Sequence, residues 1–209
     1  MTRLTSADLD ALFSESNILE VGGNLGDVTY QLLALGPATL TVTEKEAIWC
    51  DFLRQRFKGS IVKVLNNNIL DDKSLIALSR YNVIFLKELL NALPMNTYEA
   101  LFKNCFSLLE KKGKLVIVDY SPLVIYRHFL MSLLRQPWGV IGNLRRLYNN
   151  IKMKRTLSEN QFGEFFPANK FVVSYHYAFD YLNGYDSGVH KFVERMLPCK
   201  YVAIIERLE

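Results

Sequence analysis

A nucleoside-binding site is suggested by a glycine-rich turn and by two glutamates, one within and one at the end of a short hydrophobic run. Glu20 lies in the first run, and Gly22, Gly23 and Gly26 follow it directly before a helical pattern. Glycines at such a turn allow positive φ angles and let a ligand lie against backbone amides that a Cβ atom would shield. Glu44 ends the second run, where a carboxylate can accept hydrogen bonds from both hydroxyls of a ribose.

The spacing of the glycines argues against a dinucleotide. The fingerprint of dinucleotide-binding proteins is G-x-G-x-x-G, whereas this turn has Asn24 at the middle position and Asp27 after Gly26. A carboxylate at Asp27 would repel a pyrophosphate, so the turn is a poor phosphate-binding loop. A nicotinamide-dependent dehydrogenase is disfavoured on this ground.

The elements that must position these residues alternate along residues 17–120. Runs rich in Val, Ile, Leu or Thr read as buried strands, and each is followed by apolar residues at helical spacing. The runs are Asn17–Gly23, Ala38–Glu44, Ser60–Leu65, Tyr81–Leu86 and Lys114–Tyr120, and the helical segments are Asp27–Leu35, Glu46–Phe57, Asp72–Leu78 and Asn96–Glu110. Two further strands, Phe171–Tyr181 and Lys200–Arg207, are expected to be antiparallel to each other. The pattern predicts an α/β fold with a doubly wound, mostly parallel seven-stranded sheet, helices on both faces, and ligands at the carboxyl ends of the strands.

The composition fits one domain and excludes several classes of protein. The chain has 209 residues, of which 50% are hydrophobic and 22% charged, a balance far from that of disordered chains. Arg127 interrupts the most apolar segment, and the first residues, MTRLTSADLD, carry acids where a signal peptide has an apolar region. The cysteines Cys50, Cys105 and Cys199 are widely spaced and suggest neither a disulfide framework nor a zinc site. We expect a single domain over residues 1–209, located in the cytoplasm.

The positive charge is concentrated in one segment. The net charge is +4, yet residues 120–158 contain seven basic residues and no acidic one. Apolar stripes at helical spacing run through Tyr126–Leu134 and Val140–Ile151, with Arg145 and Arg146 on the other side of the second stripe. Such helices can lie on an anionic membrane, cover a lipid-like or acidic substrate, or only expose a solvated basic face. Nucleic acid is disfavoured because the basic residues alternate with aliphatic ones. We expect residues 121–160 to form a basic helical insert that covers the substrate.

Residues 17–122 resemble class I S-adenosylmethionine-dependent methyltransferases, especially those acting on small molecules, quinones and lipids. ILEVGGNLGDVTYQLLALG is similar to the first motif of that family, and TLTVTEKE resembles its second strand with a ribose-binding acid. YNVIFLKELLNALP is similar to the fourth motif, and FKNCFSLLEKKGKLVIVDY to the helix, turn and fifth strand that follow. The resemblance implies a Rossmann-like methyltransferase fold, S-adenosylmethionine as cofactor, and methyl transfer to a small-molecule or lipid-like acceptor.

The resemblance also implies roles for individual residues. Glu20, Gly22, Gly23 and Gly26 would lie along the methionine part of the cofactor, and Glu44 would hold its ribose.

Two later strand ends would complete the cofactor site by the same resemblance. Asn67 would read the edge of the adenine, although Asn66 or Asn68 could take that register. Leu86 and Lys87 would pass their backbone beside the sulfonium.

Three positions depart from the family's pattern. Asn24 replaces the middle glycine, which is tolerable because Asn adopts left-handed backbone conformations more readily than most residues. Asn82 stands where the family commonly has Asp, and Ala92 where many members have His. These departures leave a second class open, a methyltransferase-like binding or partner protein without methyl transfer activity.

Catalysis of methyl transfer requires few catalytic side chains. Much of it can come from holding the acceptor atom in line, and a general base is needed only where the acceptor must lose a proton. The candidates near the strand ends are Glu88, Tyr120, Tyr126 and His128, although Lys87 and Glu88 could equally form a surface ion pair. No catalytic triad or metal cluster is visible in the sequence.

Overall fold

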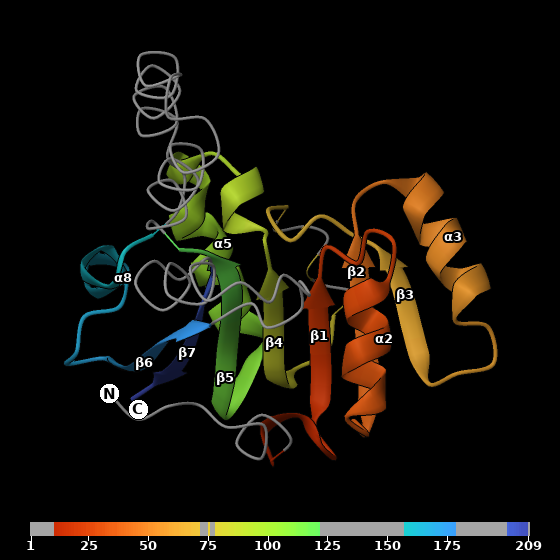
Figure 1. Cartoon of the computed structure of the whole chain (residues 1–209), viewed down its shortest axis with the longest axis horizontal. Coiled ribbons are helices and arrows are strands. Elements are labelled where there is room, and N and C mark those ends of the chain that lie inside the picture. The colour runs from red at the N-terminus through yellow and green to blue at the C-terminus, as the bar shows by residue number, and fades with distance from the viewer. Residues whose placement is uncertain (1–10, 72–74, 76–77, 122–156, 179–199, 209) are drawn as a thin grey trace, which may run out of the picture.

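Seven strands form one sheet in the computed structural model, which describes residues 11–71, 75, 78–121, 157–178 and 200–208 (Figure 1). The strand order is β3-β2-β1-β4-β5-β7-β6. The strands are β1 (Asn17–Val21), β2 (Thr39–Glu44), β3 (Val62–Asn66), β4 (Tyr81–Lys87), β5 (Leu109–Tyr120), β6 (Phe171–Ala178) and β7 (Lys200–Arg207). The first five pair in parallel, and β7 is antiparallel to both β5 and β6. The predicted α/β class with a mostly parallel seven-stranded sheet is confirmed.

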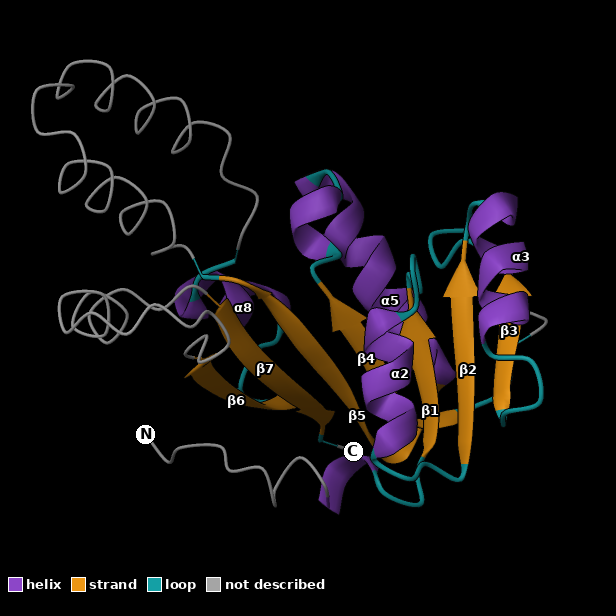
Figure 2. Cartoon of the chain, turned by 45° about the vertical axis from the view of Figure 1, so that its right-hand side comes forward, coloured by secondary structure: helices purple, strands orange, loops and turns teal. Residues whose placement is uncertain are grey.

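Each face of the sheet has its own hydrophobic core, because successive side chains of a strand point to opposite faces. On one face Val83 of β4 packs in a cluster with residues of α2 (Asp27–Ala34) and α3 (Ala47–Arg56). On the other face Ile84 packs in a cluster with residues of α5 (Tyr98–Leu108) and α8 (Glu159–Phe165). Helices therefore cover both faces, as predicted (Figure 2).

Several predicted boundaries differ from the observed ones by a few residues. β1 ends at Val21 rather than at Gly23, because Gly22 has a φ of +84° and turns the chain out of the sheet. The helix expected to reach Glu110 ends at Leu108, since Leu109 already pairs with Tyr81 in the sheet. Most of the helical segment predicted after β3 lies outside the described residues.

The basic insert predicted at residues 121–160 also lies almost entirely outside the described part of the chain, which resumes at Leu157. Its helices and its covering role therefore stay predictions. Within the residues described, no helix has the length and apolar character needed to span a bilayer.

Candidate functional site

A cavity of about 560 Å³ lies at the carboxyl ends of β1, β2 and β4. This is the edge where ligands bind in doubly wound sheets. Six of the eight residues predicted to bind a cofactor line the cavity: Glu20, Gly22, Gly23, Gly26, Glu44 and Lys87. The strand ends predicted to carry function are thus brought together around one hollow.

The glycine turn between β1 and α2 has the backbone geometry that its sequence requires. Gly22 and Gly26 have φ angles of +84° and +82°, and Asn24 has a φ of +46°. Asn24 therefore occupies the left-handed region that Asn tolerates, as predicted. The turn is closed by a hydrogen bond of 2.8 Å from the amide of Gly26 to the carbonyl oxygen of Gly23.

Close packing also requires glycine at positions 23 and 26 of this turn. A Cβ atom on Gly23 would lie 2.3 Å from Cγ1 of Val42, and one on Gly26 would lie 2.7 Å from the Phe57 ring. Both distances are too short for any side chain. The turn can therefore lie directly on the core beneath it, and its backbone forms the cavity wall.

Glu44 presents a fixed carboxylate to the cavity. Its side chain is buried, and its two oxygens accept backbone N–H bonds of 3.0 Å, Oε2 from Asn24 and Oε1 from Glu46. Each carboxylate oxygen has further acceptor capacity, so both can still accept hydroxyl donors from a ligand. The carboxylate is thus held in place before any ligand binds.

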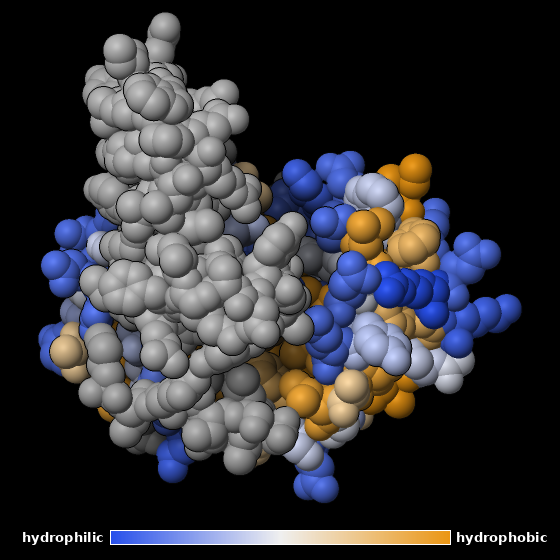
Figure 3. Space-filling model, viewed as in Figure 1, coloured by the Kyte–Doolittle hydropathy of each residue, from blue (hydrophilic) through white to orange (hydrophobic). Residues whose placement is uncertain are grey.

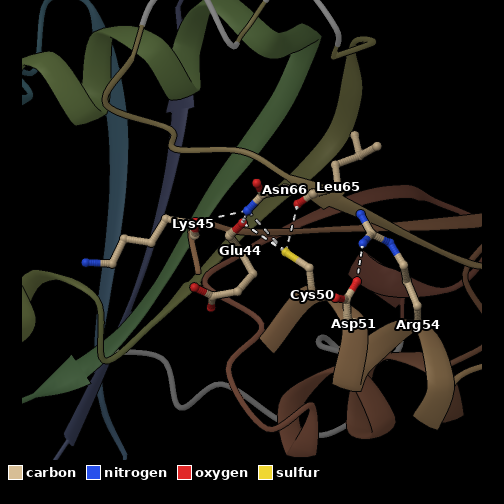
Figure 4. A network of polar contacts seen from close by, with 7 residues as sticks. All are labelled: Glu44, Lys45, Cys50, Asp51, Arg54, Leu65 and Asn66. Carbon is tan, nitrogen blue, oxygen red and sulfur yellow. Dashed lines mark hydrogen bonds and ion pairs between the residues drawn. The ribbon is translucent and has the colours of Figure 1, made fainter. Parts of the chain in front are cut away.

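The backbone of Glu44 is anchored by its neighbours as well (Figure 4). The side-chain amide of Asn66 donates to the carbonyl oxygens of Glu44 and Lys45, at 3.0 and 2.9 Å. The Cys50 thiol donates to the carbonyl of Glu44 at 3.2 Å. The Nδ2 of Asn66 therefore holds the end of β2, and adenine recognition by Asn66 stays an open alternative.

Glu20 is the buried acid of the cavity. The residue is 3% exposed, and its carboxylate accepts a hydrogen bond of 2.7 Å from the hydroxyl of Thr29 on α2. Burial raises the pKa of Glu20 to about 7, against the lowering effects of the Thr29 hydrogen bond and the charge of Lys87. Near neutral pH the side chain can therefore gain or lose a proton in response to a ligand charge.

Two predicted cofactor residues do not line the cavity. The amide of Asn67 donates to the carbonyl of Glu44 at 2.9 Å, and its side chain is buried beside the end of β2. The side chain of Leu86 is fully buried in the core on the α5 face, and the predicted approach of its backbone to the sulfonium stays a prediction. The other alternative, Asn68, accepts the backbone N–H of Leu70 through its Oδ1. Adenine recognition by Asn67 stays a prediction.

The predicted catalytic residues have mixed placements. Glu88 lines the cavity, and the Tyr120 hydroxyl donates to its Oε2 at 3.2 Å. His128 and Tyr126 lie outside the described residues. Lys200, which was not singled out in the sequence, forms an ion pair of 3.1 Å with Glu88. The pairing of β5 with β7, which places Lys200 opposite Tyr120, was not predicted.

The sequence reasoning also missed Trp49, the third residue of α3, which lines the cavity. Figure 3 shows hydrophobic surface on the side of the molecule where α2 and α3 lie. Exposed apolar side chains in this region include Leu25, Ile48, Trp49 and Phe52. The sequence did contain a signal for this residue, because Trp49 is an aromatic residue five positions after Glu44, the candidate ribose-binding acid.

The departure at Asn82 has a structural cause away from the cavity. Its Oδ1 accepts the backbone N–H of Asn17 at 2.9 Å, and its Nδ2 donates to Glu110 at 2.6 Å. Both partners lie at the end of the sheet opposite the cavity. The Asn82 side chain thus links β4 to β1 and β5. This departure from the family's pattern therefore does not argue against methyl transfer. Among the described residues, no group of His, Cys, Asp and Glu is arranged to hold a metal ion.

Comparison with known proteins identifies the fold. No protein-family model matches the sequence, and neither does any curated protein. The structure is similar to the N-methyltransferase NodS from Bradyrhizobium japonicum WM9, with 18% identity, a TM-score of 0.57, and coverage of 94% of this chain and 88% of that one. It is also similar to magnesium protoporphyrin IX methyltransferase from Synechocystis PCC 6803 with bound S-adenosylmethionine, with 10% identity, a TM-score of 0.60, and coverage of 96% and 74%.

A third similar structure is a TehB-like S-adenosylmethionine-dependent methyltransferase from Corynebacterium glutamicum. It shares 15% identity at a TM-score of 0.59, over 93% of this chain and 82% of that one. These likenesses span nearly the whole chain. The protein therefore has the class I methyltransferase fold, as the resemblance in its sequence implied.

Proposed function

We propose that this protein transfers a methyl group from S-adenosylmethionine to a small-molecule or lipid-like acceptor. The observation that carries the proposal is the fixed Glu44 carboxylate beside a glycine turn, in one cavity at the carboxyl edge of the sheet. The similar structures support it, because they are methyltransferases and one holds S-adenosylmethionine.

The residues present fit this cofactor. The Glu44 carboxylate would accept the ribose hydroxyls, and the turn formed by Gly22, Gly23 and Gly26 would lie against the methionine part. Glu20 would compensate the positive charge of the cofactor's amino group. When bound, S-adenosylmethionine supplies an electrophilic methyl group on a sulfonium. The protein's share of the chemistry is to orient the acceptor and exclude water.

Glu44→Ala is expected to weaken binding of S-adenosylmethionine at least tenfold, about 1.4 kcal/mol, because charge-assisted hydrogen bonds to the ribose are lost. Calorimetric titration with S-adenosylmethionine and with S-adenosylhomocysteine measures the effect. Micromolar binding of both compounds by the wild type is the expected result. The matched control is Asp51→Ala, an acid on α3 that pairs with Arg54 at the surface. Equal affinity in Glu44→Ala and wild type would remove Glu44 from the cofactor site.

Trp49→Ala is expected to weaken cofactor binding about tenfold, since stacking of a base on an aromatic side chain contributes about 1–3 kcal/mol. The same titrations measure it, and binding should change the fluorescence of the wild type through Trp49. Phe52→Ala is the control, because Phe52 contacts the Trp49 ring at a centroid distance of 6.2 Å and does not line the cavity. Comparable losses in the two variants would mean that Trp49 acts only by packing.

The basic segment 121–160 keeps its predicted role in covering a lipid-like substrate and in peripheral contact with an anionic membrane. Cofactor binding without transfer to any acceptor would favour the second class, a binding or partner protein with this fold.

A further inference from the structure

Glu88 directly follows β4 at the rim of the cavity, in a backbone conformation that glutamate rarely adopts. Its φ is +54°, in the left-handed region, and its amide donates to the carbonyl of Val118 at 2.8 Å. A side chain with a Cβ is strained in that region, and such strain persists only where the surrounding structure holds it. The turn at Glu88 keeps its carboxylate at the cavity, where glycine would be the unstrained choice.

Two polar side chains from other strands hold this carboxylate. Lys200 at the start of β7 forms an ion pair of 3.1 Å with Oε1, and the Tyr120 hydroxyl at the end of β5 donates to Oε2 at 3.2 Å. The antiparallel register of β5 and β7 places Tyr120 opposite Lys200, and the ammonium lies 5.6 Å from the centre of the Tyr120 ring. Glu88, Tyr120 and Lys200 form one cluster, which we call the rim cluster.

The two carboxylate oxygens of Glu88 are used unequally. A hydroxyl bonded to a carboxylate is normally about 2.5–2.7 Å away, so the 3.2 Å contact from Tyr120 is a weak one that another donor can replace. Burial and the neighbouring Glu88 charge raise the pKa of Tyr120. Tyr120 is therefore a neutral donor at neutral pH, and it is not a base.

A buried acid supports the rim cluster from below. Asp119 is fully buried and accepts the backbone N–H of Tyr120 at 2.7 Å and of Asn91 at 3.1 Å. These bonds join the end of β5 to the turn after β4. Asp119 is thereby a positioning residue for Glu88 and Tyr120.

We propose that the rim cluster binds the methyl acceptor and selects a protic nucleophile, a hydroxyl or amine whose proton must leave; this rests on the proposed methyl transfer. The acceptor's O–H or N–H takes the place of Tyr120 at Oε2 of Glu88. A bond forms between the acceptor atom and the methyl carbon as the S–C bond breaks. The electron pair of the S–C bond stays on sulfur, and the acceptor's proton passes to Glu88. Lys200 holds Oε1 so that Oε2 faces the acceptor.

Two readouts test the role of Glu88, and the first needs no acceptor. Glu88→Gly and Glu88→Ala both remove the carboxylate, but only glycine is unstrained at this φ. Glu88→Gly should therefore unfold at a higher temperature than Glu88→Ala. Equal unfolding temperatures would mean that the backbone at Glu88 is not strained and would overturn the argument for a retained carboxylate.

The second readout is transfer of radiolabelled methyl groups from S-adenosylmethionine to phenols, alcohols and primary amines, each with a carboxylate counterpart that has no proton to lose. We expect transfer to the protic compounds, at least a 100-fold loss in Glu88→Gln, and a smaller loss in Tyr120→Phe. Glu206→Gln is the control, because that acid pairs with Lys114 at the opposite end of the sheet.

The outcomes separate this proposal from the proposed function. Binding of S-adenosylhomocysteine should be unchanged in Glu88→Gln. Transfer confined to carboxylates, or full transfer by Glu88→Gln, overturns the acceptor site alone. A loss of cofactor affinity in Glu88→Gln equal to its loss of transfer also overturns it, by assigning Glu88 to the cofactor. Cofactor binding with no transfer to any compound overturns the proposed methyl transfer. No cofactor binding by the wild type overturns the proposed function itself.

Discussion

Gly26→Ala is expected to lower the free energy of unfolding by about 3 kcal/mol. Two costs add at this position. The φ of +82° is unfavourable for a residue with a Cβ, by about 1–2 kcal/mol. The new Cβ would also lie 2.7 Å from the Phe57 ring and 2.8 Å from Leu53, and overpacking a core costs about 1–3 kcal/mol. Urea unfolding followed by circular dichroism measures the loss.

Gly36→Ala separates the two costs. Gly36 also has a positive φ, of +68°, but a Cβ there would have no neighbour within 4 Å. We therefore expect a loss of only about 1 kcal/mol, from the backbone alone. If both variants lose the same stability, the turn at Gly26 does not pack on Phe57 and Leu53 as described. Gly26→Ala should in addition weaken cofactor binding, because the turn forms the cavity wall.

Glu20→Gln is expected to stabilise the protein at high pH by about 3 kcal/mol. The folded state keeps a proton on Glu20 up to about pH 7, whereas the unfolded chain releases it near 4.5. The folded state thus binds more protons between these values, and the free energy of unfolding falls as the pH rises through them. The stabilising contribution is complete below pH 4.5 and lost above pH 7. Each pKa unit corresponds to about 1.4 kcal/mol.

The glutamine variant mimics protonated Glu20 and can still accept the hydrogen bond from Thr29. Its unfolding free energy should match that of the wild type at pH 4 and exceed it at pH 8. Asp119, whose pKa is also raised by burial, adds a similar decline to both proteins and cancels in the difference. Glu164→Gln, a change at an exposed acid on α8, is the control. Parallel pH profiles for wild type and Glu20→Gln would show that burial does not disfavour the Glu20 charge.

Cofactor-site residues could be predicted where local sequence fixes local geometry. Gly22, Gly26 and Glu44 occupy the ends of strands that the hydrophobic runs already revealed, and parallel strands bring those ends to one edge. The side-chain directions of Asn67 and Leu86, which do not line the cavity, could not be predicted in the same way. A shift of one residue at the end of a strand turns a side chain from the cavity into the core, and the sequence does not settle that register.

The order of strands and helices along the chain, the class of the sheet and the edge expected to bind a ligand could be predicted from the sequence. This was possible because hydrophobic period and glycine conformation are local properties of the chain. The position of β7 between β5 and β6, which brings Lys200 to Glu88, could be found only from the three-dimensional structure. The same holds for the burial of Glu20, which raises its pKa. Strand pairing and desolvation depend on residues far apart in the chain, so the local pattern does not contain them.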